Sequence, residues 1–80
     1  MNLTIRLLAS YRQYLPEERG NDSSYPLDVP RGARVDEVLP RLPIPHGDAY
    51  TFFVNGRHAV HDQVLADGDV LTVFPAVGGG

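Results

Sequence analysis

The sequence contains no cysteine, and this absence excludes several classes of protein at once. Disulfide bridges, cysteine-based zinc sites and iron–sulfur clusters all require thiol ligands, so none of them can stabilise or equip this chain. A side-chain thiol that carries sulfur is excluded for the same reason. Fold and function must therefore rest on other residues.

Positive charge and long apolar runs are also scarce. Lysine and arginine together number 7 against 10 acidic residues, a formal net charge of −3. No basic stripe is present to neutralise phosphates, which argues against a nucleic-acid partner. No apolar run approaches the roughly 20 residues of a membrane-spanning helix, and residues 1–6 show no signal-peptide pattern. We expect one small soluble domain in the cytoplasm, with no membrane partner.

Two segments, residues 3–9 and 25–29, show the alternation of apolar and polar residues that is typical of half-buried strands. Two more segments, residues 51–54 and 70–74, are apolar runs next to turn signals and predict two further strands. Because Pro26 has no N–H for a sheet ladder, the segment over residues 25–29 is expected at a sheet edge. Residues 10–24 are polar and indicate a loop with one helical turn near residues 11–15. The four predicted strands cover residues 3–9, 25–29, 51–54 and 70–74.

One helix is predicted between the second and third strands. Val35, Val38, Leu39 and Leu42 recur at the spacing of one helical face. Pro40 falls inside this pattern, where a regular helix would lose about 3 kcal/mol. We therefore expect a short or kinked helix that ends by Leu42, with Arg34 as a poor N-cap before it.

A tight turn is predicted at Asn55-Gly56, followed by a short return strand over residues 57–60. Asp67-Gly68 gives a second turn signal before the last strand. Hairpin-like pairs on both sides of one helix predict an α+β roll. Its mixed sheet of four to five strands would pack on the short helix.

Three glycines, Gly78, Gly79 and Gly80, follow the last predicted strand almost directly. Glycine has no Cβ and tolerates almost any backbone conformation, so such an arm could enter a narrow channel of another protein and present a bare carboxylate. A frayed terminus or an expression artefact is the alternative.

Three motifs stand beside this order of elements: Val54-Asn55-Gly56, Leu65-Ala66-Asp67-Gly68-Asp69 and Phe74-Pro75-Ala76-Val77-Gly78-Gly79-Gly80. Together they resemble the ubiquitin-like sulfur-carrier family, which includes the small subunit of molybdopterin synthase and the sulfur carrier of thiazole biosynthesis. The resemblance implies a β-grasp domain over residues 1–75 and a flexible glycine tail over residues 76–80. In this family the position of Gly78 is commonly alanine, which makes Gly79-Gly80 the terminal pair.

The resemblance implies a carrier and not an enzyme. A partner adenylyltransferase of the ubiquitin-activating type would use ATP to adenylate the carboxylate of Gly80, and a sulfur donor would then displace AMP to leave a thiocarboxylate. The carrier itself would bind no cofactor. A larger synthase subunit or another acceptor would receive the sulfur. The tail from Phe74 to Val77 matches the molybdopterin type better than the thiazole type, although other sulfur pathways fit it as well.

A docking surface is predicted beside the tail. Alternation places Phe52 and Val73 on the sheet face that should pack on the helix. It leaves Phe53 and Phe74 on the opposite, outer face. Exposed aromatic residues often mark partner sites, and the resemblance implies that this sheet face meets partner enzymes. Cover from the loop at 10–24, or plain exposure, is the alternative. The expected partner-binding residues are Phe53, Phe74, Pro75 and Val77.

Two further alternatives stay open. His58 and His61 form a His-x-x-His pair near His46, but on a short strand and turn these side chains need not converge, so we expect no metal site. The glycine end could also be joined to lysine amines, as in a ubiquitin-like modifier, or remain unactivated in a plain interaction module. The sequence does not separate these outcomes, because one activated acyl group reacts with sulfur donors and amines alike.

Overall fold

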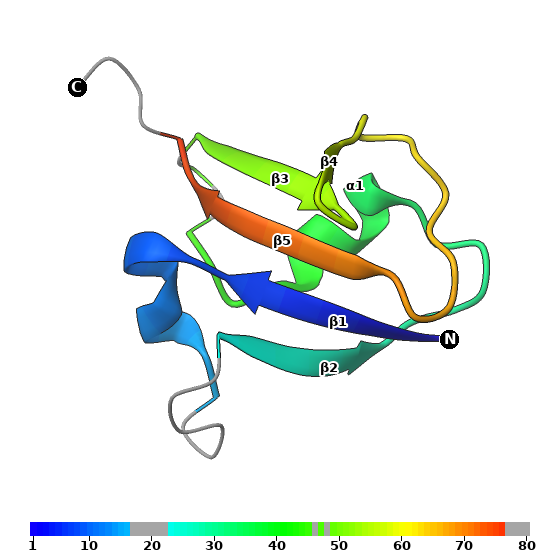
Figure 1. Cartoon of the computed structure of the whole chain (residues 1–80), viewed down its shortest axis with the longest axis horizontal. Coiled ribbons are helices and arrows are strands. Elements are labelled where there is room, and N and C mark those ends of the chain that lie inside the picture. Colours follow the sequence, from blue (N-terminus) through cyan, green and yellow to red (C-terminus); the bar gives the residue numbers. More distant parts are fainter. Residues whose placement is uncertain (17–22, 46, 48, 77–80) are drawn as a thin grey trace.

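Five strands form a single mixed sheet in the order β2-β1-β5-β3-β4 (Figure 1). The computed structural model describes residues 1–16, 23–45, 47 and 49–76. The central strand, β5, is parallel to its neighbour β1, and the other three pairings are antiparallel. This arrangement confirms the predicted mixed sheet. The strands are β1 (Asn2–Leu7), β2 (Ser24–Asp28), β3 (Tyr50–Val54), β4 (Arg57–His58) and β5 (Val70–Pro75).

Strand β2 lies at one edge of the sheet, as Pro26 predicted. Pro26 stands opposite Thr4 of β1, its one neighbour strand, so its missing N–H removes no hydrogen bond from a central ladder. At the other edge, β4 contains only Arg57–His58, two residues shorter than the return strand expected over residues 57–60. The chain leaves the ladder there because residues 59–64 turn towards the helix.

The predicted helix is present but divides at its proline. Helix α1 (Val35–Val38) is followed directly by the 3-10 turn η3 (Leu39–Arg41), which contains Pro40. Proline lacks the N–H for an i→i−4 hydrogen bond, and its ring clashes with the carbonyl of the preceding turn. The α-helical hydrogen-bond ladder therefore ends before Pro40. The four apolar positions of the predicted face are all buried, at 0–3 % exposure.

A neighbouring loop supplies the cap that Arg34 cannot supply. The N–H of Val35 donates to the carbonyl of Gln63 (3.0 Å), and the N–H of Asp36 donates to that of His61 (2.7 Å). Within the helix, the Glu37 carboxylate accepts the N–H of Arg34 at 2.8 Å. The first turn is thus satisfied despite the weak cap expected from the sequence.

The core lies between the sheet and the helical segment. Alternation along β1 and β5 points Leu3, Ile5, Leu71 and Val73 towards the helix, and each is fully buried. Burying one such side chain stabilises the fold by about 1.5–3 kcal/mol. The 3-10 helix η1 (Ala9–Tyr14), where one helical turn was expected, adds the buried ring of Tyr11 to this core.

Candidate functional site

The rings of Phe53 and Phe74 lie together on the sheet face that points away from the helix. Their centroids are 5.5 Å apart and their planes meet at 65°, an edge-to-face contact. The two strands are antiparallel, with Thr51 opposite Phe74 and Phe53 opposite Thr72, so the rings are diagonal neighbours on one face. Their opposite-facing neighbours, Phe52 and Val73, are buried in the core. The predicted orientation of both phenylalanines is confirmed.

Two more side chains complete this surface. His58 stands opposite Phe53 on β4, and its ring meets the Phe53 ring nearly perpendicularly at 4.8 Å. Thr72 lies in register between Phe53 and Arg6 and is 7 % exposed, although it faces away from the core. We call Phe53, His58, Thr72 and Phe74 the outer aromatic patch. Both phenylalanine rings are half-buried, because each is covered on one side by a neighbouring ring.

The patch borders the point where the described chain ends. Pro75 pairs with Tyr50 at the end of β5, and the N–H of Ala76 donates to the carbonyl of Ala49 at 3.2 Å. The chain is therefore held to β3 as far as Ala76, two residues beyond Phe74. The predicted positions Val77, Gly78, Gly79 and Gly80 lie outside the described residues.

The histidine pair does not converge on a common point. The ring of His58 contacts Phe53, whereas the ring of His61 contacts Phe52 at 4.9 Å. These two phenylalanines project from opposite faces of β3, so the two imidazoles are directed to different surroundings. Among the described residues, no three His, Cys, Asp or Glu side chains are grouped so that they could hold a metal ion.

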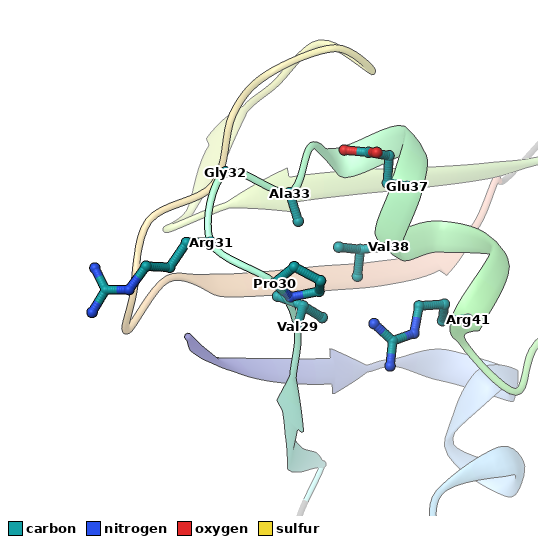
Figure 2. Close-up of a pocket in the computed structure, with 8 residues that line it drawn as sticks. All are labelled: Val29, Pro30, Arg31, Gly32, Ala33, Glu37, Val38 and Arg41. Carbon is teal, nitrogen blue, oxygen red and sulfur yellow. The ribbon is translucent and has the colours of Figure 1, made fainter.

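A pocket of about 270 Å³ lies beside α1 and shares no residue with the patch. Figure 2 shows Arg31 and Arg41 at opposite sides of it, with Pro30 and Val38 between them. Arg41 donates a long hydrogen bond (3.5 Å) to the carbonyl of Asp28. Glu37 accepts the backbone N–H of Arg34. Glu37 and Arg41 are thus turned to backbone groups, and Arg31 points away from the other lining residues (Figure 2), so the charged groups do not converge on a ligand.

Comparison with protein families matches residues 5–80 to a family described as the ThiS family. The chain belongs to the ThiS family. Members of this ThiS/MoaD-like group are small ubiquitin-like sulfur carriers that act with partner enzymes. The resemblance inferred from the closing motifs is confirmed. A comparison with curated protein sequences gave no match.

Solved structures confirm the β-grasp fold of this ThiS-family chain. The HVO 2177 protein of Haloferax volcanii is 29 % identical, with a TM-score of 0.76 over 100 % of this chain and 87 % of that one. A Pyrococcus furiosus chain assigned as molybdopterin converting factor, subunit 1, is 24 % identical, with a TM-score of 0.74 over 95 % and 98 %. Small archaeal modifier protein 1 of H. volcanii is 21 % identical, with a TM-score of 0.72 over 95 % and 98 %.

Sequence reasoning missed the burial of two residues of this ThiS-family chain, one in the core and one in the outer aromatic patch. Tyr11 lies in a polar window yet is buried in the core, and Thr72 is buried on the outer face. No periodic signal marks either residue, because their burial arises from neighbours that are distant in sequence. In the part of the chain that the structure describes, no helix is both long and apolar enough to cross a bilayer.

Proposed function

We propose that this chain carries sulfur on its C-terminal glycine as a thiocarboxylate. The observation that carries the proposal is the range of the family match, which covers residues 5–80 and so includes Gly79 and Gly80. The tail follows a strand that is hydrogen-bonded to its neighbour as far as Ala76. Gly80 is four residues beyond Ala76, so the acyl end can lie no farther from the sheet than four extended residues reach.

The proposed chemistry proceeds in two steps at the Gly80 carbonyl carbon. First, a carboxylate oxygen attacks the α-phosphorus of ATP, and pyrophosphate leaves. Next, hydrosulfide delivered by a sulfur donor attacks the carbonyl carbon, the bond from that carbon to the AMP oxygen breaks, AMP leaves, and loss of the sulfur-bound proton to solvent gives the thiocarboxylate. Adenylation gives a poor acyl electrophile a good leaving group, and the absence of a Cβ leaves the attacked carbon unhindered. The partner enzyme binds the ATP and supplies the catalytic groups; the carrier binds no cofactor.

The outer aromatic patch is the proposed docking surface for these partners. Phe53 and Phe74 are anchored by their mutual edge-to-face contact, so they present rigid apolar area at little entropic cost. Pro75 and Val77 would continue the contact into the partner's channel. The activating adenylyltransferase and the sulfur acceptor would both approach this side, because each must reach Gly80.

We propose a molybdopterin-type acceptor, which is a larger synthase subunit. The likeness to the P. furiosus molybdopterin converting factor chain supports this destination. The second candidate function is protein modification, in which the activated glycine is joined to an amine. The likeness to small archaeal modifier protein 1 favours that candidate.

An ATP–pyrophosphate exchange assay with the cognate activating enzyme tests the proposal. Gly80→Ala should abolish exchange, because a methyl group at the attacked residue obstructs the channel and crowds the carbonyl. Gly47→Ala is the matched control, since Gly47 has open space around it and does not adopt positive φ. ATP–pyrophosphate exchange by Gly80→Ala at the wild-type rate would overturn the proposal.

A further inference from the structure

Every positively charged side chain in the sequence is an arginine. Lysine and arginine together number 7, and that number is fully accounted for by Arg6, Arg12, Arg19, Arg31, Arg34, Arg41 and Arg57. The 80-residue chain therefore has no lysine, and it also has no cysteine. The six arginines that the structure describes are all exposed. The surface thus carries positive charge without a side-chain amine or thiol.

This composition has a chemical consequence for a protein that holds an activated acyl group. A lysine amine that has lost its proton attacks an acyl adenylate or thioester and forms a stable amide. An arginine guanidinium stays protonated at any physiological pH and offers no free lone pair. The exposed imidazoles of His58 and His61 could accept an acyl group, but an acyl imidazole hydrolyses and restores the histidine. Hydroxyl groups are weak nucleophiles at neutral pH without an adjacent base.

The amine that remains in the chain is the α-amino group of Met1, and in the folded chain this group is hydrogen-bonded. Its ammonium group donates to the carbonyl of Val29 at 2.7 Å and lies 3.6 Å from a carboxylate oxygen of Asp28. The N–H of Val29 returns a hydrogen bond to the carbonyl of Met1 at 2.9 Å. The two residues thus extend the β1–β2 ladder by one pair, which ties the amine to the neighbouring strand. The Met1 side chain is 3 % exposed, and the residue as a whole, backbone included, is partly exposed. Attack by this nitrogen requires the ladder end to open first.

We infer that the chain is a donor-only carrier, whose activated glycine finds no durable acceptor on another copy of the same chain. The inference rests on the proposed function, since it concerns the fate of the activated acyl group. Activated carriers at high local concentration then hydrolyse or react with their intended partner; they do not consume one another. In the modifier alternative, the same property limits each acceptor amine to one added copy, because the added copy provides no lysine for a second.

The first test measures amine reactivity without any activation of Gly80. The folded full-length chain is treated with the N-hydroxysuccinimide ester of acetic acid, and acetylation is followed by intact mass and peptide mapping. Acetylation of Met1 should be about tenfold or more slower in buffer than in urea, as expected when reaction requires local opening. Equal rates would overturn the claim that the fold protects this amine.

The second test measures self-acylation without the activating enzyme. The full chain is prepared as a C-terminal thioester and incubated at several concentrations. In self-acylation an amine nitrogen bonds to the Gly80 carbonyl carbon, the carbon–sulfur bond breaks, the thiolate leaves and the amine proton passes to solvent. The wild-type thioester should give only hydrolysis, whereas Arg57→Lys and Arg12→Lys should give hydroxylamine-resistant dimers whose yield rises with concentration.

Arg57→Gln is the matched control, because it removes the same charge-bearing side chain without adding an amine. The inference is overturned if wild type dimerises at the rate of the lysine variants. It is also overturned if neither lysine variant dimerises, since lysine would then not be what limits self-acylation. Both tests are independent of the activating enzyme, so a failure of the proposed sulfur chemistry would appear in the exchange assay and not here.

Discussion

Asn55 and Val70 hold each other through two hydrogen bonds. The backbone N–H of Asn55 donates to the carbonyl of Val70 at 2.8 Å, and the N–H of Val70 donates to the side-chain oxygen of Asn55 at 2.9 Å. The Asn55 amide also donates to Asp69 at 2.9 Å. These bonds connect the turn after β3 to the first residue of β5. They set the register that brings Phe53 next to Phe74.

Asn55→Ala should destabilise the fold by about 2–3 kcal/mol, because it removes two side-chain hydrogen bonds and places alanine at a positive φ. The φ of Asn55 is +53°, in the left-handed region that asparagine tolerates better than alanine. Asn55→Gly relieves the backbone and loses only the side-chain bonds, so it should cost about 1 kcal/mol less. Urea unfolding measures both variants, and equal losses would contradict the role assigned to φ.

Phe74→Ala should weaken binding to the activating enzyme by about tenfold or more, as expected for an aromatic anchor at an interface. The melting temperature should fall by only a few degrees, because the ring is half-buried on the outer face. Val64→Ala is the control, since Val64 is 57 % exposed outside the patch and should leave binding unchanged. Titration calorimetry and a thermal scan give both quantities. Unchanged binding by Phe74→Ala would remove the patch from the account.

Ionisation of Tyr25 should lower the free energy of unfolding in alkaline solution. Burial raises the pKa of its phenol above the ordinary value of 10.0. The unfolded chain therefore loses this proton at a lower pH than the folded chain does. The stabilisation is complete below pH 10.0 and is lost as the pH rises through the pKa of the folded state.

Tyr25→Phe removes this titration. The difference in unfolding free energy between wild type and Tyr25→Phe should be constant below pH 10.0 and move in favour of the variant above it. Urea unfolding at a series of pH values measures this difference. A constant difference across the whole alkaline range would show that Tyr25 does not contribute to the alkaline loss.

The sequence predicted the parts of the fold that depend on local pattern. Alternation in β3 and β5 assigned Phe53 and Phe74 to the outer face, and Pro40 gave the end of the α-helix. The face of each phenylalanine and the end of the helix depend only on a residue and its near neighbours in the chain. Periodicity and backbone chemistry were therefore sufficient to predict both.

The features that the sequence did not predict depend on contacts between distant segments. The carbonyls of His61 and Gln63 cap a helix that begins at Val35, and no local sequence motif predicts these two hydrogen bonds. Tyr11 is buried because η1 folds back against the sheet, in a window whose composition reads as polar loop. The packing of Phe53 against His58 also required the β3–β4 register, which the turn type constrains but does not fix alone.

The intact mass of the protein isolated from its native host decides whether Gly80 carries a thiocarboxylate. The cells should be grown with ample sulfur and the protein recovered without strong nucleophiles, which would cleave the activated end. We expect a species heavier than the sequence mass by the exchange of one oxygen for one sulfur, with the change mapped to Gly80. A chain found only with the unmodified mass, or one that continues beyond Gly80, would contradict this expectation.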